Sequence, residues 1–158
     1  MKIEWDFSEL TEFENKLSDY THFETELKRA TKEIAHELLR RIKKYTPVGD
    51  TWALINGWNK NDFTVVEVTN GFEVCLVNST EYATWVNDGH KQKPGRFIPG
   101  HFIGGRFYYD RTAKGGMVLK APFVKGRFFV EKGIIDLDSS VVIESIIEQH
   151  LQKWWDSL

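Results

Sequence analysis

Apolar residues at helical spacing dominate the first third of the chain. They recur at steps of three and four, which makes one stripe along a helix: Phe23, Leu27, Ala30, Ile34, Leu38, Ile42 and Tyr45. Thr21 and Glu24 have the spacing of a capping box, and Thr46-Pro47 disfavours continuation of the helix. The pattern predicts a helix over about 21–45, a rod of roughly 37 Å that must bury one face.

Two β-rich runs flank Asn70-Gly71, the strongest short hairpin signal in a sequence, and predict a hairpin over 63–77. A second long hairpin is predicted over about 104–123, with 106–111 pairing 118–123 across 112–117. Pro122 would confine that second strand to an edge or to its end.

The remaining helical signals are shorter. We expect helices over 7–17 and 124–134, a short helix or turn that ends at Gly89, and a last helix capped by residues 138–140. The last helix would carry Ile143, Ile146, Ile147, Leu151 and Trp154. Helices that bracket a mostly antiparallel sheet predict an α+β fold, a single domain over 1–158 with a protruding Gly-rich basic loop at about 91–122.

Length and composition fit one cytosolic domain. The chain has 158 residues and a single cysteine, Cys75, which excludes an internal disulfide and lies in an apolar run, so we expect a buried thiol. No apolar run is long enough to span a membrane, and the polar, acidic N-terminus does not resemble a secretory signal. We expect a soluble protein without membrane partners.

Charge is distributed unevenly. Residues 91–127 contain nine basic residues and one acid, Asp110, a net +8, which leaves −10 on the rest of a chain whose total is −2. This polarity predicts one face that attracts anions and another that repels them.

Motifs for catalysis are weak. The best enzymatic candidate combines Asp88, His90 and His101, which could bind a divalent metal and make a nuclease beside the basic loop. Two histidines and an aspartate near flexible glycines arise often by chance, so we expect loop or interface roles, no enzyme and no cofactor. His22, His36 and His150 are expected to be solvated or partly exposed positions on helices, and Cys75 an inert thiol.

The basic loop mixes cations with aromatic rings. Such a mixture suits nucleic acid, which needs charge for phosphates and rings for bases, and it equally suits the anchors of a protein interface. A solvated hairpin without a partner is the third interpretation. We favour an interface between copies, with DNA contact as a secondary role, through Arg96, Phe97, Arg106, Phe107, Tyr108, Tyr109, Arg111, Lys114 and Lys120.

Three segments together resemble one family of tailed-phage proteins, the tail-completion or head–tail joining proteins. Residues 46–58 resemble its Thr-Pro-Val…Trp signature, 78–90 its Tyr-Ala-x-x-Val…Gly-His motif, and 123–133 its Phe-Val-x-Gly motif. The matching positions are Thr46, Pro47, Val48, Trp58, Tyr82, Ala83, Val86, Gly89, His90 and Gly126. Gly49 is an insertion, Trp52 replaces the family's Gly and Ile55 its Arg, which puts the tight turn in question.

The resemblance implies a small α+β fold and a structural role. Family members assemble into a ring, sixfold in many cases, at the junction of the portal complex and the tail tube, without catalysis or cofactor. For this chain it implies a phage or prophage protein of the virion, assembled in the bacterial cytoplasm. Its partners would be copies of itself and neighbouring connector and tail-tube proteins. A metal-dependent nuclease and a non-catalytic nucleic-acid-binding protein remain the alternatives.

Overall fold

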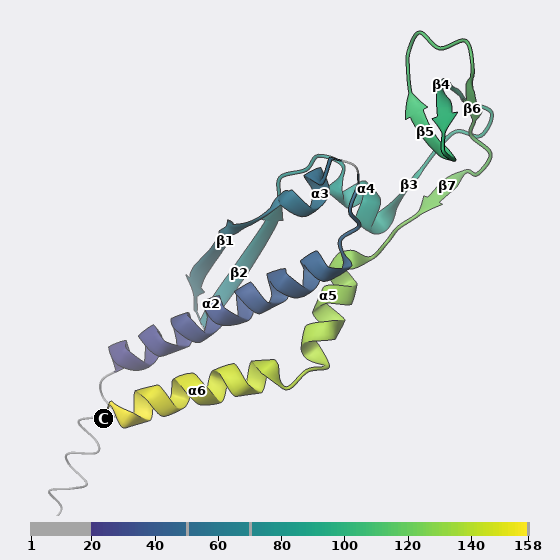
Figure 1. Ribbon diagram of the computed structural model, residues 1–158. Helices are drawn as coiled ribbons and strands as arrows, with labels where there is room; N and C mark the ends of the chain where they lie inside the picture. Colours follow the sequence, from purple (N-terminus) through teal and green to yellow (C-terminus); the bar gives the residue numbers. More distant parts are fainter. Residues whose placement is uncertain (1–19, 50, 70, 158) are drawn as a thin grey trace, which may run out of the picture. The chain divides into compact units, whose positions relative to one another are not determined.

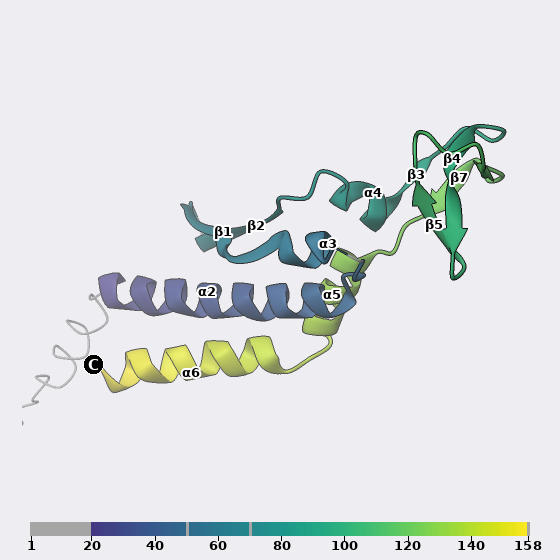
Figure 2. The same cartoon turned by 45° about the horizontal axis from the view of Figure 1, so that its top comes forward.

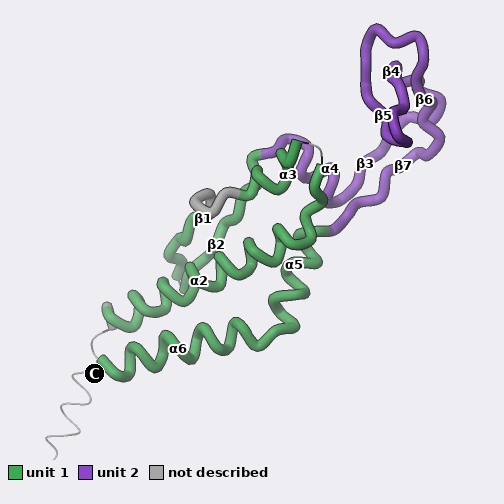
Figure 3. Tube along the Cα trace, viewed as in Figure 1, with its two compact units in different colours: residues 1–79, 129–158 green, residues 80–128 purple. Residues whose placement is uncertain are grey.

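The computed structural model describes residues 20–49, 51–69 and 71–157, without the side chains of 20, 21 and 59–62. The chain divides into two compact units, residues 1–79 with 129–158 (unit 1) and residues 80–128 (unit 2) (Figure 3). Each is described by itself, and the expectation of one domain stays a prediction. The helix expected over 7–17 lies outside the described residues. None of the described helices is long and apolar enough to cross a membrane.

Helix α2 (Tyr20–Tyr45) confirms the longest predicted element. It ends where Thr46 turns back on the last turn, because its backbone N–H and its hydroxyl both donate to the Ile42 carbonyl, at 2.9 and 2.8 Å. The predicted N-cap is wrong, since Thr21 already lies inside the helix.

Other elements cover α2 on two sides in unit 1 (Figures 1 and 2). Helices α5 (Phe129–Asp138) and α6 (Val142–Asp156) pack on one side, and the antiparallel strands β1 (Trp58–Val68) and β2 (Gly71–Asn78) on the other. Covering from two sides buries residues beside the predicted stripe as well as on it: Ala30, Ala35, Leu39 and Ile42. This arrangement confirms the α+β class and the first hairpin.

Cys75 is exposed on β2, so the buried thiol is a wrong prediction. On this strand exposure alternates, with Glu73, Cys75 and Val77 facing out. Successive residues of a strand point to opposite faces. The face on which Cys75 lies therefore determines its exposure, and the apolar residues beside it in the sequence do not.

The C-terminal helices differ from the predicted 124–134 and from the predicted cap. Residues 123–125 form a strand, and α5 begins only at Phe129, after Phe128 takes a left-handed φ of 52°. The serines expected to cap the last helix instead end α5, because the Ser140 and Ser139 hydroxyls donate to the Leu137 and Asp136 carbonyls. Helix α6 begins after Val141, without a side-chain cap.

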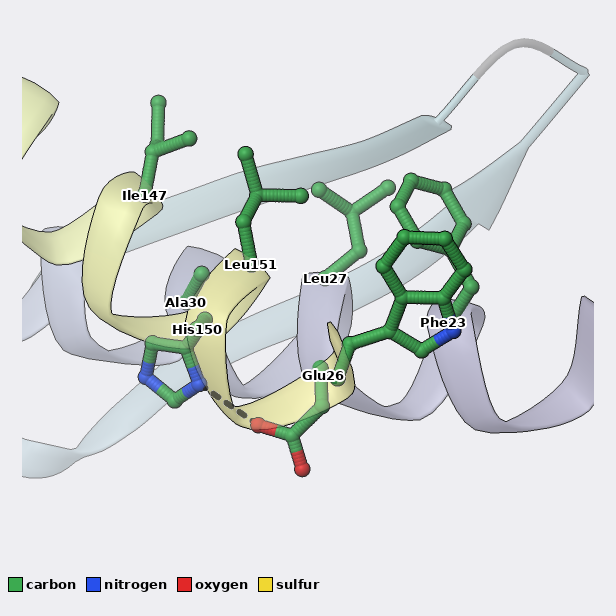
Figure 4. A pocket seen from close by; sticks show the side chains of 8 residues that line it. Phe23, Glu26, Leu27, Ala30, Ile147, His150 and Leu151 are labelled. Carbon is green, nitrogen blue, oxygen red and sulfur yellow. Dashed lines mark hydrogen bonds and ion pairs between the residues drawn. The ribbon is translucent and has the colours of Figure 1, made fainter. Parts of the chain in front are cut away.

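His150 is buried between α6 and α2, which corrects the expected solvated role. Its Nδ1 lies 2.8 Å from Glu26 Oε2 and its Nε2 lies 3.1 Å from Glu33 Oε2 (Figure 4 shows the Glu26 contact). Glu26 is buried as well and also bonds Arg29. The hydrogen bond with His150, helped by Arg29, holds the pKa of Glu26 below its usual 4.5, against the opposing effect of burial.

Glu26→Gln is therefore expected to lower the free energy of unfolding at pH 7 by about 2 kcal/mol, the size of a hydrogen bond to a charged group. A carboxylate whose folded pKa is depressed stabilises the protein above its unfolded pKa and loses that effect as the pH falls. Urea unfolding from pH 7 to pH 3 should show the two curves converging below pH 4.5. Glu33→Gln, at a carboxylate that is 48% exposed, is the control and should cost less than about 1 kcal/mol. A constant gap at all pH values would contradict the assignment.

Unit 2 contains α4 (Ala83–Asp88) and five short strands. These are β3 (Gly89–Lys91), β4 (Phe97–Ile103), β5 (Arg106–Tyr109), β6 (Gly116–Val118) and β7 (Phe123–Lys125). Strand β4 lies between β5 and β6, and β3 pairs with β7. The short helix ending at Gly89 is confirmed.

The predicted pairing of 106–111 with 118–123 is wrong. Strand β5 pairs with the preceding β4, across a tight turn at Gly104-Gly105, where φ is 56° and 80°. Two consecutive positive φ values favour a two-residue hairpin turn. The strand that this turn requires begins at Phe97, a run broken by Pro99 and Gly100 that gave no clear strand signal.

Candidate assembly interface

The second and third family-like motifs meet in the antiparallel pair β3–β7. Gly89 lies opposite Lys125, His90 opposite Val124 and Lys91 opposite Phe123. The pair closes the base of the basic segment, and further bonds continue from it, Gln92 N–H to the Pro122 carbonyl (3.0 Å) and Gly95 N–H to the Leu119 carbonyl (2.8 Å). Two segments more than thirty residues apart in sequence therefore hold the basic segment at both ends.

Glycine is required on both sides of this base. Gly89 has a φ of 84°, and a Cβ there would lie 2.3 Å from the Val124 carbonyl oxygen. A Cβ on Gly126 would lie 2.2 Å from the Asn87 carbonyl oxygen. The next two residues bond the same helix, Arg127 N–H to Val86 and Phe128 N–H to Asn87, both at 2.9 Å. The glycines of the motifs thus serve close backbone packing.

The predicted interface residues all lie on the β5-β4-β6 sheet or the loops beside it. Phe97 is on β4, and Arg106, Phe107, Tyr108 and Tyr109 form β5. Arg96 precedes β4, while Arg111, Lys114 and Lys120 lie in the loops around β6. Five of the nine predicted residues therefore lie on this small sheet, and the other four lie in the loops beside it.

Large aromatic side chains on this sheet are exposed. Phe97 is 51% and Tyr109 66% exposed, and Phe102 of β4 is exposed as well. Phe107 is half-buried and packs edge-on against Phe102, with ring centroids 5.2 Å apart. Phe107 thus has a packing role, whereas the exposed rings are available to a partner.

Four exposed cations beside the sheet are not paired with a carboxylate among the described residues. Arg96, Arg111, Lys114 and Lys120 are exposed, and none of the carboxylates that the structure describes forms an ion pair with them. The one acid among them, Asp110, accepts from the Thr112 hydroxyl (2.7 Å) and backbone N–H (2.8 Å). These bonds hold the pKa of the Asp110 carboxyl below its usual range, with a smaller contribution from His101.

A groove of about 800 Å³ opens beside the β3–β7 pair. His90 lines it, with its Nδ1 buried and without a hydrogen-bond partner among the described residues, and the exposed Trp85 ring lies 6.0 Å from the His90 ring. The other lining residues are Lys91, Gln92, Lys93, Arg96 and Leu119. Sequence reasoning missed the contributions of Trp85 and Lys93 to this groove.

The nuclease hypothesis finds no geometric support. Within the described ranges, no group of three His, Cys, Asp or Glu side chains is close enough to hold a metal ion. Asp88 instead accepts from the Asn87 amide, and His101 lies 3.6 Å from Asp110. Asp88, His90 and His101 are therefore not brought together.

The pocket between α2 and α6 is too small for a ligand (Figure 4). Its volume is about 20 Å³, room for roughly one water molecule. Ligand sites typically measure hundreds of Å³, so this pocket belongs to the helix packing.

The first family-like motif lies in unit 1 and is mostly structural. Thr46 ends α2, and Trp58 packs edge-on against Phe129. Pro47 and Val48 belong to the loop that follows α2. Trp52, where the family has glycine, keeps a left-handed φ of 56° before the short helix α3 (Ala53–Asn56). Trp52 thus takes a backbone conformation that glycine adopts more easily.

Comparison with known proteins gives a consistent result. Residues 8–89 match the model of the family described as "Bacteriophage HK97-gp10, putative tail-component". The chain is 32% identical over 118 residues to "Uncharacterized protein YqbI" of Bacillus subtilis (strain 168), covering 69% of this chain and 70% of that protein. It is 28% identical over 113 residues to "Phage-like element PBSX protein XkdI" of the same organism, covering 69% of each chain. No solved structure matches.

Proposed function

This chain belongs to the HK97-gp10-like family of phage tail components, and we propose that it is a tail-completion protein that forms a ring at the head–tail junction. Its partners there are copies of itself and the adjoining connector and tail-tube proteins. The observation that carries the proposal is the exposed set of cations and aromatic rings on and beside the β5-β4-β6 sheet.

Charge supports contacts between copies. The segment 91–127 carries +8 and the remaining residues carry −10. A head-to-tail contact between unlike patches generates a ring when the rotation closes, and opposite charges guide such a contact. In the proposed ring, the basic sheet of one copy docks on the acidic surface of the next.

The groove beside β3–β7 is the proposed centre of this contact. An incoming carboxylate would find Lys91, Lys93 and Arg96 around it. The exposed Trp85 and Phe97 rings supply the apolar anchors that interface centres require.

Reversing the charge of this surface should block the joining of heads to tails. We expect the triple variant Arg96→Glu, Arg111→Glu, Lys114→Glu, introduced in the parent phage, to accumulate separate full heads and tails in electron micrographs. The purified variant should keep its melting temperature within a few degrees, because exposed substitutions change stability by about 0.5 kcal/mol or less.

A control with the same change of charge uses Lys28→Glu, Lys32→Glu and Lys153→Glu, exposed positions on α2 and α6. Joined particles should form normally with it. Normal joining by the first variant would refute the proposed role of the sheet.

Contact with DNA is the second candidate function, favoured by the same exposed cations and tyrosines. It predicts binding that weakens steeply with salt and with loss of Arg96, Arg106 and Arg111. Filter binding of duplex DNA at 50 and 200 mM salt would separate it from the ring contact.

A further inference from the structure

The outer side of α5 mixes apolar and acidic side chains. The inner side of this helix packs on α2 and is buried through Phe129, Gly133 and Leu137. On the opposite side, exposed residues recur at steps of three and four and so form one stripe: Glu131, Ile134, Ile135 and Asp138. A helix with apolar residues on both sides has more apolar surface than its own unit buries.

The same pattern continues into the start of α6. Val141, which directly precedes α6, is 80% exposed, and Glu144 lies in the first turn of that helix. Ile135 is 65% exposed. We call these exposed residues the α5 face: Ile134, Ile135, Asp138, Val141 and Glu144. Grouped apolar side chains beside charges are typical of a protein interaction surface.

The carboxylates of the α5 face are available to a partner. Neither Asp138 nor Glu144 forms an ion pair with a residue that the structure describes. Other carboxylates of α2 and α5 are already paired within unit 1, namely Glu26, Glu33, Glu37 and Asp136. The negative charge that unit 1 offers to a partner is therefore concentrated on the outer side of α5 and on the hairpin, where Glu67 and Glu73 are exposed.

The groove beside β3–β7 has the complementary chemistry. Lys93 and Arg96 are exposed at its wall, and its apolar lining comes from Leu119 and from Trp85, which is 62% exposed. Its volume of about 800 Å³ can receive the side chains of a helix face. A helix that places apolar side chains in a groove while its charges pair at the rim is a recurrent mode of recognition.

We propose that the α5 face of one copy docks into the groove beside β3–β7 of the next copy. Ile134 and Ile135 enter the groove, and Asp138 and Glu144 pair with its cations. The α5 face is preferred to the hairpin because it presents both isoleucines and carboxylates on a helix, which fits a groove. This inference rests on the proposed function, since it names the acidic surface that receives the basic sheet.

Reversing the charge on each side tests the contact. The α5-face variant combines Asp138→Lys with Glu144→Lys, and the groove variant combines Lys93→Glu with Arg96→Glu. In sedimentation experiments on the full chain, each variant alone should associate at least about tenfold more weakly than an equimolar mixture of the two, because like charges meet in the first case and opposite charges in the second. Mixing can restore only a contact between separate copies. A mixture that associates no more tightly than either variant alone would overturn the proposal.

The matched control combines Glu67→Lys with Glu73→Lys on the exposed hairpin, the same change of charge. It should associate as the wild-type chain does. Weakened association of the control, with normal association of the α5-face variant, would overturn the proposal by assigning the contact to the hairpin. The melting temperature of all three variants should stay within a few degrees of the wild type, because the substitutions are exposed.

The parent phage separates a failure of this inference from a failure of the proposed function. We expect both the α5-face variant and the groove variant to block the joining of heads to tails. Joining blocked by the groove variant alone would overturn the assignment of the α5 face and leave the role of the basic sheet intact. Normal joining with both variants would refute the proposed function itself.

Discussion

Gly133→Ala is expected to lower the free energy of unfolding by about 3 kcal/mol, although alanine is the better helix former. Gly133 is buried where α5 crosses α2, and a Cβ there would lie 2.6 Å from Ile42 Cγ1 and 2.8 Å from both the Cα and the N of Ile42. Helix propensity favours alanine by about 1 kcal/mol. Overpacking in a close-packed core costs up to about 3 kcal/mol, and more where backbone must move, so the contact should outweigh propensity.

Urea unfolding followed by circular dichroism measures this effect. Gly49→Ala is the matched control, because a Cβ on Gly49 meets nothing within 4 Å. It should change stability by less than about 0.5 kcal/mol. If Gly133→Ala were instead stabilising, the close crossing of α5 over α2 would be wrong.

Elements defined by local pattern could be predicted from the sequence. The stripe from Phe23 to Tyr45 specifies α2, and the runs around Asn70-Gly71 specify the first hairpin, because spacing and turn chemistry act within a few residues. The end of α2 at Thr46 follows from the same local chemistry.

Features that depend on distant partners could not be predicted. Residues 123–125 resemble the start of a helix in sequence, but they form a strand because they pair with β3. His150 resembles a surface residue, but Glu26 and Glu33, more than a hundred positions away, make it a buried hydrogen-bonded group. In both cases the partner, not the local sequence, decides the structure.

The candidate interface shows the same division. Composition predicted its cations and rings, because clustered charge and aromatic residues are visible in sequence. Its groove was not predictable, since Trp85, Arg96 and Leu119 come together only through pairing across the base of unit 2.

Gly126→Ala should unfold the base of unit 2 and leave unit 1 folded. The added Cβ would lie 2.2 Å from the Asn87 carbonyl oxygen and 2.5 Å from the Asp88 carbonyl carbon. Both are backbone atoms, so a change of side-chain conformation cannot relieve the clash. The segment that follows β7 must therefore move away from α4. That movement breaks the bonds from Arg127 and Phe128 to α4 and the β3–β7 pair. Each lost backbone hydrogen bond costs about 1 kcal/mol, so losing these bonds together should unfold strands of only three residues.

Hydrogen exchange distinguishes this outcome from global unfolding. The bonded amides of Gly95, Gly100 and Leu119 should lose protection at least a hundredfold, while amides in the middle of α2 keep theirs. Gly115→Ala is the control within the same unit, because its Cβ would lie an ordinary 3.6 Å from the Gly100 carbonyl oxygen. If β3–β7 positions the docking surface, Gly126→Ala should also abolish head–tail joining without changing any residue of that surface. Protected amides combined with lost joining would place Gly126 itself in the contact and would contradict its role as a structural support.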